Sequence, residues 1–258
     1  MELYILGSGT CVPYLRRSSP GIALKIEDNI VLLDSGSGTM RRLLEAGLEY
    51  LEIDFMFYTH FHPDHTGDLI PLLFAMKNTP ELLRDKDLVL VGPEGFKELY
   101  NSFISLYGKW ITSLSYKILI HEVSTIENSE FTFKNFKVMS TPVLHSKNSV
   151  AYRVESEDGE GKQSSVVFSG DTDYCESLIK IAKDVDILIL ECSFPDEKRV
   201  SGHLTPSLAG QIAKRSSCKK LILTHFYPVC DSHDILNQCR SVYQGEIVLA
   251  EDLMRFVL

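Results

Sequence analysis

The sequence predicts an α/β protein in which mixed β-sheets are covered by helices. Two observations lead to this prediction. Short β-rich runs alternate with helical periodicity along the whole chain, and successive strands open the first half whereas strand and helix alternate in the second. The composition agrees, because 44% of the 258 residues are hydrophobic and 24% are charged, which excludes a disordered or collagen-like chain.

The predicted strands are short runs of apolar and β-branched residues. They cover residues 3–6, 22–26, 30–33, 55–59, 88–91, 117–120, 131–133, 136–140, 150–154, 165–169, 185–190, 221–224 and 246–250. The polar, glycine-containing segment 155–163 lies between two of these runs. It is therefore predicted to be a hairpin loop.

The predicted helices have apolar residues at helical spacing. They cover residues 39–46, 66–76, 93–106, 176–182, 206–215 and 233–239. Phe103, Tyr107 and Trp110 are expected to serve helix packing. No Pro/Ser-rich linker, repeat or long charge run interrupts the pattern, so residues 1–258 are expected to form one domain.

Charge and hydropathy limit the classes of partner. The chain has 35 acidic and 26 basic residues, a formal net charge of −9, which disfavours indiscriminate binding to nucleic acid or to an anionic membrane. The N-terminus lacks the parts of a secretion signal, and no apolar stretch approaches the ~18 residues of a membrane span. We therefore expect a cytoplasmic protein without a membrane partner, whose six scattered cysteines are reduced thiols.

Three histidines and an aspartate lie within six residues, directly after an apolar strand. They are His60, His62, Asp64 and His65. If the extended geometry persists to His62, the period of two places His60 and His62 on one face, where they can converge on one metal. Pro63 ends strand pairing and turns Asp64 and His65 toward a second position. A histidine-rich loop that merely caps a strand is the alternative, but the number and type of ligands favour two metals.

Three further ligand-type residues follow apolar strands elsewhere in the chain. They are His145, Asp171 and His225. Each alone also fits a hydrogen-bonded histidine or a helix N-cap, but together they complete a ligand set for the cluster. A dinucleotide site is not expected at Gly7-Ser8-Gly9, because no helical pattern follows and Val12 stands where a third glycine would be.

The order of these motifs resembles the metallo-β-lactamase superfamily of dinuclear metallohydrolases. The order is His-x-His-x-Asp-His at residues 60–65, a distant His145, Ser-Gly-Asp-Thr at 169–172 and Thr-His at 224–225. Flanking segments resemble the ribonuclease Z-like branch, which includes transfer-RNA 3′-processing nucleases and related phosphodiesterases. These segments are Leu-Gly-Ser-Gly-Thr at 6–10, Leu-Asp-Ser-Gly-Ser-Gly-Thr at 33–39 and Gly-His-Leu-Thr-Pro at 202–206.

The resemblance implies a four-layer αββα sandwich with the site at one edge, between the two sheets. It also implies the ligand sets, in which Asp171 bridges two divalent ions. One ion is held by His60, His62 and His145, and the other by Asp64, His65 and His225. Nitrogen and oxygen ligands suit zinc first, with manganese or iron as alternatives.

A two-metal site of this kind activates a bridging water near neutral pH, and the hydroxide attacks the substrate. The two cations exceed the negative charge of Asp64, Asp171 and this hydroxide, so the site stays locally positive and suits a phosphodiester. Asp64, which is also a metal ligand, and His203, as general acid, are the candidate catalytic residues. Asp34 is expected to orient a ligand, and Asp68 to be a solvated or capping acid.

The sequence also departs from the transfer-RNA processing members. It has no Gly/Pro-rich arm between residues 80 and 136 and no Pro-x-Lys-x-Arg-Asn loop between His145 and Asp171. We therefore expect a small-molecule or nucleic-acid phosphodiester as substrate, without an extended grip on nucleic acid. A homodimer is common in this branch. Two alternatives remain: hydrolysis of another ester class (aryl sulfate, thioester or lactone), and a metal-binding or redox scaffold that hydrolyses nothing.

Overall fold

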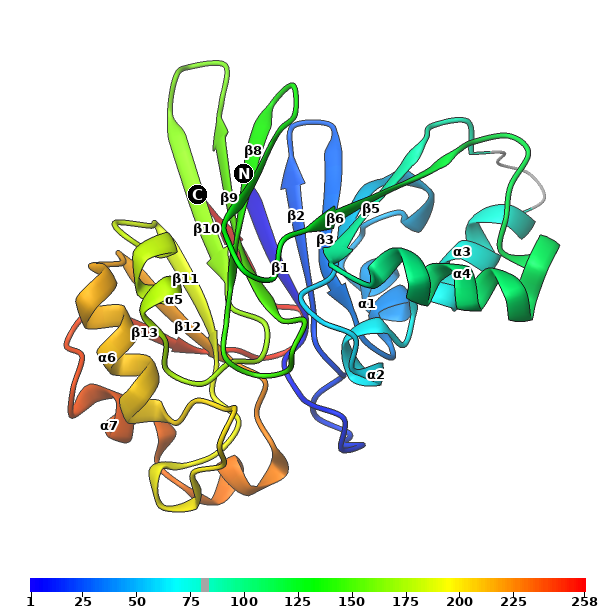
Figure 1. The fold of residues 1–258 in the computed structure, drawn as a ribbon. Coiled ribbons are helices and arrows are strands. Elements are labelled where there is room, and N and C mark those ends of the chain that lie inside the picture. Colours follow the sequence, from blue (N-terminus) through cyan, green and yellow to red (C-terminus); the bar gives the residue numbers. More distant parts are fainter. Residues whose placement is uncertain (80–83) are drawn as a thin grey trace.

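The computed structural model describes residues 1–79 and 84–258. In these residues two seven-stranded β-sheets pack face to face, and helices cover the outer face of each sheet (Figure 1). The prediction of a four-layer αββα sandwich with two mixed sheets is thus confirmed.

The first sheet has the strand order β14-β1-β2-β3-β4-β5-β6. Its strands are β1 (Glu2–Gly7), β2 (Gly21–Ile26), β3 (Asn29–Ser35), β4 (Ile53–Phe57), β5 (Leu88–Pro93), β6 (Ile118–Val123) and β14 (Arg255–Val257). Neighbours are antiparallel from β14 to β3 and parallel from β3 to β6. In the parallel half, successive strands are connected through helices within residues 39–45, 69–78 and 96–107.

The second sheet has the order β13-β12-β11-β10-β9-β8-β7. Its strands are β7 (Ser129–Thr132), β8 (Phe136–Pro142), β9 (Val150–Glu157), β10 (Gln163–Phe168), β11 (Ile187–Glu191), β12 (Lys220–Thr224) and β13 (Glu246–Leu249). Strands β7 to β10 pair antiparallel and β10 to β13 pair parallel, so this sheet is mixed in the same way as the first.

The helices divide between the two outer faces. Those over the first sheet are α1 (Thr39–Glu45), α2 (Pro63–Thr66), α3 (Leu69–Asn78) and α4 (Phe96–Tyr107), and those over the second are α5 (Glu176–Ile181), α6 (Pro206–Ser216) and α7 (Ile235–Arg240). Short 3₁₀ turns occupy Tyr50–Glu52, Gly108–Trp110, Asp196–Lys198 and Pro228–Ser232.

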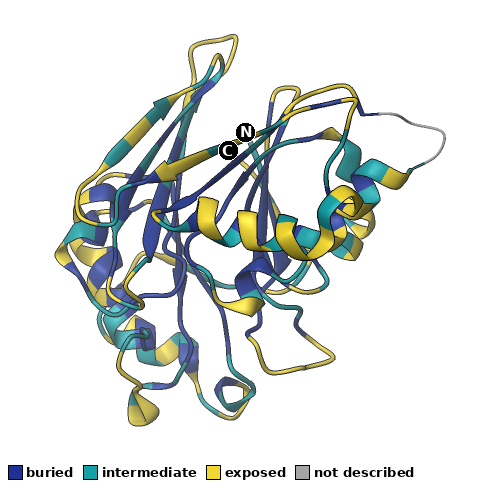
Figure 2. Cartoon of the chain, turned by 45° about the vertical axis from the view of Figure 1, so that its right-hand side comes forward, coloured by how far each residue is buried: buried dark blue, intermediate teal, exposed yellow. Residues whose placement is uncertain are grey.

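Apolar side chains fill three layers between these elements. In β3, Leu32 packs toward the helices while Leu33 packs between the sheets, and in β11 Leu188 and Ile189 divide in the same way. Successive residues of a strand point to opposite faces, so strands buried on both faces are continuously apolar. Figure 2 shows the central strands buried and the outer helix faces exposed. The apolar segments from which the strands were predicted therefore supply side chains to the core on both faces of each sheet.

Two features differ from the sequence prediction. The short edge strand β14 was not predicted; it exists because it pairs with β1, far away in the chain. The helix predicted over residues 66–76 is instead two helices, since the chain breaks at Gly67 and Asp68, where the Asp68 carboxylate accepts the backbone N–H groups of Gly38 and Met40. Asp68 thus caps the start of α1, and capping was one of the two roles predicted for it.

The described residues contain neither a Gly/Pro-rich arm nor a membrane-spanning helix. From 84 to 136 the chain forms β5, α4, β6 and β7 without a Gly/Pro-rich arm; residues 80–83, the rest of the region named for that arm, lie outside the described residues. No described helix is long and apolar enough to cross a bilayer. All six cysteines are unpaired, as predicted.

Candidate metal centre

The histidine-rich segment leaves the first sheet earlier than predicted. Strand β4 ends at Phe57, so strand pairing does not reach His62, although the backbone of His62 is itself extended (φ −60°, ψ 144°) and His60 and His62 belong to the same group of ligand atoms. The Thr59 N–H donates to Asp34 Oδ1 (2.8 Å), and the Thr59 carbonyl accepts from Val150 of the other sheet (2.9 Å). These bonds replace strand pairing and direct the following residues to the gap between the sheets. Helix α2 then begins at Pro63, a residue suited to the first turn of a helix.

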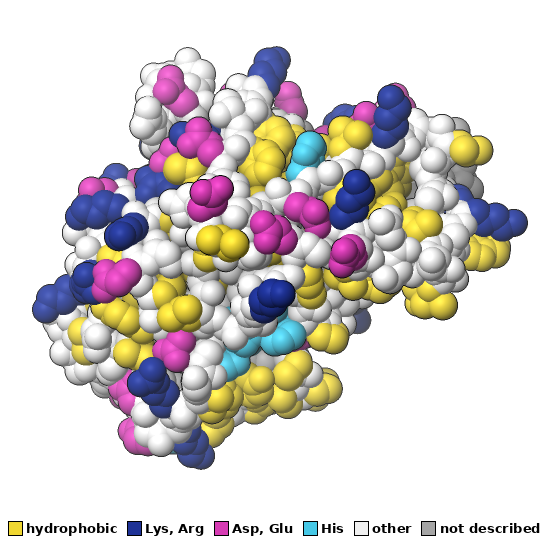
Figure 3. Space-filling model, in the orientation of Figure 1, with side chains coloured by type: hydrophobic (Ala, Val, Ile, Leu, Met, Phe, Trp, Pro, Cys, Tyr) yellow, Lys and Arg dark blue, Asp and Glu magenta, His cyan; other side chains and the backbone are white. Residues whose placement is uncertain are grey.

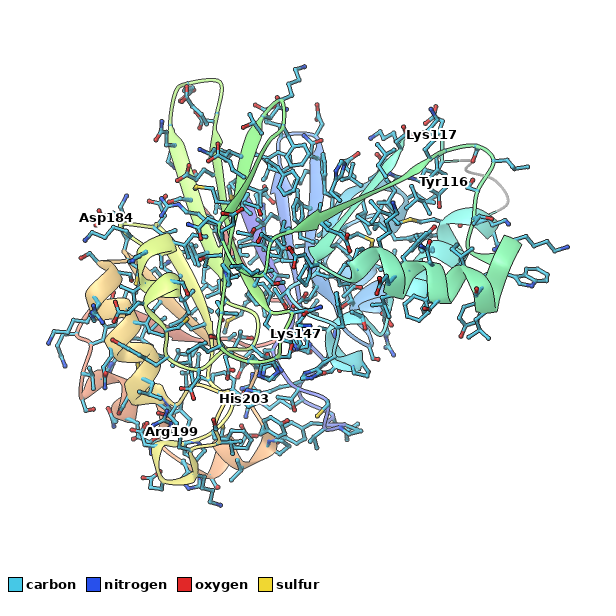
Figure 4. The ribbon with its side chains drawn as sticks, viewed as in Figure 1. Tyr116, Lys117, Lys147, Asp184, Arg199 and His203 are labelled. Carbon is cyan, nitrogen blue, oxygen red and sulfur yellow. The ribbon has the colours of Figure 1, made fainter. Side chains whose placement is uncertain are left out.

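The other three predicted residues reach the same gap from the second sheet. His145 follows β8, Asp171 follows β10 and His225 follows β12. Figure 4 labels His203, which lies within 4.8 Å of ligand atoms of Asp171 and His225, at the lower edge of the sandwich, and Figure 3 shows a small area of histidine reaching the surface there. All seven residues predicted as ligands are therefore close together, in two groups whose ligand atoms lie within 4.8 Å of one another.

Asp171 lies between the two groups. Its Oδ2 is 3.8 Å from His60 Nε2 and 3.7 Å from His145 Nε2, whereas its Oδ1 is 3.2 Å from His65 Nε2 and 3.3 Å from His225 Nε2. Ligands bound about 2.0–2.2 Å from a tetrahedral ion lie about 3.3–3.6 Å from each other. One carboxylate oxygen thus faces each group at a spacing that an ion would fit.

Hydrogen bonds orient the histidine rings with Nε2 inward. The Nδ1 atoms of His60, His65, His145 and His225 donate, respectively, to Thr59 Oγ1 (3.1 Å), Asp34 Oδ2 (2.7 Å), the Gly202 carbonyl (2.9 Å) and Ser193 Oγ (2.9 Å). The two hydroxyls can accept, because each gives its own proton to a carboxylate. The proton on Nδ1 leaves the Nε2 lone pair available for a metal. Asp34 thus orients His65 through this hydrogen bond, in agreement with the role expected for it.

Four buried ligand atoms have no hydrogen-bond partner among the residues that the structure describes. They are Nε2 of His60, His65 and His225, and Oδ1 of Asp171. A buried polar atom left without a partner costs about 1–3 kcal/mol, so four in one cluster require an explanation. Divalent cations satisfy all four at once, and the residues present therefore fit the metal ions that the motif predicts.

The pKa shifts of His60, His62 and Asp171 agree with metal binding, whereas the carboxylates of Asp171 and Asp34 outweigh burial and raise the pKa of His65 well above its usual value, so a metal ion would have to displace a proton from that ring. Burial lowers the pKa of both His60 and His62, and neighbouring histidines lower it further, so both rings are neutral near pH 7. Burial alone would raise the pKa of Asp171, but His225 and His65 hold it well below its usual value, and the carboxyl is ionised. Neutral imidazole and carboxylate are the forms that bind metal.

Glu191 is a site residue that the sequence interpretation missed. It is buried at the end of β11, and its Oε1 accepts from His203 Nδ1 (2.8 Å), while Oε2 accepts from the Ser193 hydroxyl (2.6 Å). Burial opposes charging of His203, but the bond to Glu191 and the nearby carboxylates raise its pKa above the usual value. An acid directly after an apolar strand, the signal that identified Asp171, would also have identified Glu191.

Gly36 lets α2 approach the sheet closely enough to hold the site together. A Cβ at this position would lie 2.0 Å from the Asp64 carbonyl oxygen and 2.7 Å from that of Pro20. Both contacts are with backbone, which cannot move aside without displacing Asp64.

We expect Gly36→Ala to lower both the metal content and the melting temperature. Overpacking costs about 1–3 kcal/mol, which corresponds to a decrease of roughly 2–12 °C for a chain of this size. Metal analysis and thermal unfolding measure the two effects. Gly159→Ala is the matched control, because nothing lies within 4 Å of the added Cβ. Wild-type metal content and melting temperature in Gly36→Ala would contradict this role.

The fold and the sequence together identify the family. Residues 29–226 match the model of the beta-lactamase superfamily domain, so the chain belongs to this superfamily, whose fold implies divalent metal ions. Its seven-residue cluster occupies the edge where the resemblance predicted the site.

The individual relatives cover nearly the whole chain. Ribonuclease Z of Myxococcus xanthus is 26% identical over 303 aligned residues, which cover 98% of this chain and 96% of the relative. Among solved structures, human tRNase Z, short form, aligns with a TM-score of 0.81 at 24% identity, covering 100% and 99% of the two chains. The metallo-beta-lactamase fold protein YhfI of Bacillus subtilis gives 0.82 at 23%, covering 99% and 98%. These two structures share the fold of this chain.

Proposed function

We propose that this protein is a dinuclear metal-dependent hydrolase of phosphodiesters, a nuclease or phosphodiesterase similar to ribonuclease Z. The observation that carries the proposal is the bipartite cluster, in which the two oxygens of Asp171 face separate groups of ligand atoms. Full-length similarity to curated ribonucleases Z supports phosphodiesters over other esters as the substrate class. We infer that the whole chain acts as one catalytic unit, because both sheets contribute ligands.

The assignment of residues to ions follows the two groups. His60, His62 and His145 would hold one divalent ion, Asp64, His65 and His225 would hold the other, and Asp171, with one oxygen toward each group, would be shared between them. Zinc is proposed because the donors are imidazole nitrogen and carboxylate oxygen, without a thiolate. When bound, the ions supply an activated water at neutral pH and neutralise negative charge on the phosphoryl group.

The residues around the ions orient the metal ligands and supply a proton. Asp34 fixes His65, and Ser193 fixes His225, so the ligands keep their orientation as charge develops. His203 carries a proton, because Glu191 holds its Nδ1 and raises its pKa, and it delivers this proton to the leaving oxygen. Glu191 is thus a positioning residue for the general acid.

A substrate panel tests the proposal. Metal-loaded protein is assayed with bis(p-nitrophenyl) phosphate, an aryl sulfate, a thioester and a lactone at equal concentrations. We expect turnover of the phosphodiester above all others and its loss in His60→Ala. Fast thioester, sulfate or lactone turnover with no phosphodiester turnover would overturn the proposal in favour of another ester class, and a metal-loaded protein inactive on all four would favour a scaffold.

Two kinds of phosphodiester are candidates for the biological substrate. Both a small phosphodiester and a nucleic-acid phosphodiester suit a locally positive centre, and the absence of an arm in residues 84–136 favours a substrate that needs no extended grip. The homodimer and the cytoplasmic location stay predictions.

A further inference from the structure

A large apolar groove runs between helices α2, α3 and α4, beside the metal centre. It has a volume of about 840 Å³. Its walls include the side chains of Phe61, Ile70, Phe74, Phe103, Tyr107 and Trp110. Helix packing, the role expected for Phe103, Tyr107 and Trp110, leaves Tyr107 and Trp110 41% and 55% exposed, and both line this groove.

The chemistry of the walls favours a flat apolar ligand. None of the described residues that line the groove is acidic or basic, and five of its side chains are aromatic. The rings of Phe74 and Trp110 are 6.3 Å apart, centroid to centroid, and the ring of Phe61 stacks on that of Phe96 at 6.1 Å. Exposed aromatic faces stabilise flat rings by stacking.

The groove is lined by residues that adjoin a candidate metal ligand in the chain. Phe61 and Pro63, the two chain neighbours of His62, both line it, and His62 itself is exposed. Pro63 also lines a second cavity, which contains Asp64. A molecule whose phosphoryl group lies at the metal centre can therefore extend past His62 into the groove. In Figure 3 hydrophobic side chains lie directly beside the exposed histidines.

We propose that this groove binds the ester arm of the substrate that does not leave, and that this arm is an aromatic ring such as an aryl group or a nucleobase. The inference rests on the proposed phosphodiester hydrolysis and specifies its substrate class. The volume lies within the roughly 300–1,000 Å³ typical of small-molecule sites, so the groove has room for an aryl group or a nucleobase.

The kinetic test compares two substrates with the same leaving group. Bis(p-nitrophenyl) phosphate retains an aryl arm after p-nitrophenolate leaves, whereas methyl p-nitrophenyl phosphate retains a methyl arm. In the double variant Phe74→Ala/Tyr107→Ala we expect kcat/KM for the diaryl ester to fall about tenfold, and that for the methyl ester to change less than about twofold. Leu106→Ala is the matched control, because Leu106 adjoins Tyr107 on α4 but does not line the groove.

A binding measurement separates this inference from the proposed function. Trp110 is the sole tryptophan of the chain, so its fluorescence reports on the groove without any turnover. Titration of metal-loaded protein with diphenyl phosphate is expected to change the emission, and titration with dimethyl phosphate is expected to leave it unchanged. In the double variant the diphenyl phosphate affinity should fall about tenfold.

Each outcome decides one proposal. Emission that responds to diphenyl phosphate, in a protein that hydrolyses no phosphodiester, would support the groove and overturn the proposed function. Turnover of both diesters with equal losses in the double variant, or no response of Trp110, would overturn the groove alone. A wild-type dimer that the double variant converts to a monomer would also overturn it, because the groove would then be a contact between two copies.

Discussion

Replacing Asp171 by asparagine is expected to lower phosphodiester turnover by about 10³-fold and to reduce the bound metal below two ions per chain. Charge neutralisation by metal ions contributes several kcal/mol to the transition state, and about 4 kcal/mol corresponds to 10³ in rate. Asp171 presents one oxygen to each ligand group, at 3.2–3.3 Å on one side and 3.7–3.8 Å on the other. Asparagine keeps the shape but offers a single oxygen and no charge.

Metal analysis and kcat/KM with bis(p-nitrophenyl) phosphate measure both effects. Asp186→Asn is the matched control, because Asp186 precedes β11 at the opposite end of the same sheet, where it bonds Ser165 and Lys219. The control should retain both ions and its activity. Two ions and wild-type turnover in Asp171→Asn would show that no bridging carboxylate is needed.

Replacing His203 by alanine is expected to cost about 10²–10⁴-fold in turnover of a phosphodiester with an alkoxide leaving group. With p-nitrophenolate, a stable anion that needs no proton, the loss should stay below about tenfold. The reason is the orientation of the ring: Glu191 Oε1 accepts from Nδ1 at 2.8 Å, which keeps a proton available on the side of the metal centre.

The companion variant Glu191→Gln separates positioning from proton transfer. It removes the charge that raises the pKa of His203 while retaining its ring, so we expect a smaller loss with the same dependence on the leaving group. The measurement is kcat for a series of aryl and alkyl esters of graded leaving-group pKa. Equal losses across the series in His203→Ala would remove the role of general acid.

The sequence predicts the strands and the ligands well because both depend on local patterns. Strands such as β3 and β11 are buried on both faces, so their apolar runs are visible without knowledge of their neighbours. His225 stands directly after such a run and Asp171 stands shortly after one, and both lie at the edge of the sandwich that contains the cluster.

What the sequence could not predict depends on contacts between distant segments. Strand β14 requires pairing with β1, and the early end of β4 requires Asp34 to take the Thr59 N–H group. The role of Glu191 depends on His203 reaching it from a separate loop. The apolar groove likewise arises only when α4 packs opposite α2 and α3, so its aromatic residues resemble ordinary helix-packing positions in the sequence.

Titration of metal-depleted protein with Zn²⁺, with bis(p-nitrophenyl) phosphate turnover followed at each step, tests the two-ion phosphodiesterase most directly. We predict that two ions bind per chain and that turnover reaches its plateau as the second equivalent binds. Full turnover in metal-free protein, or no phosphodiester turnover with two ions bound, would contradict the assignment.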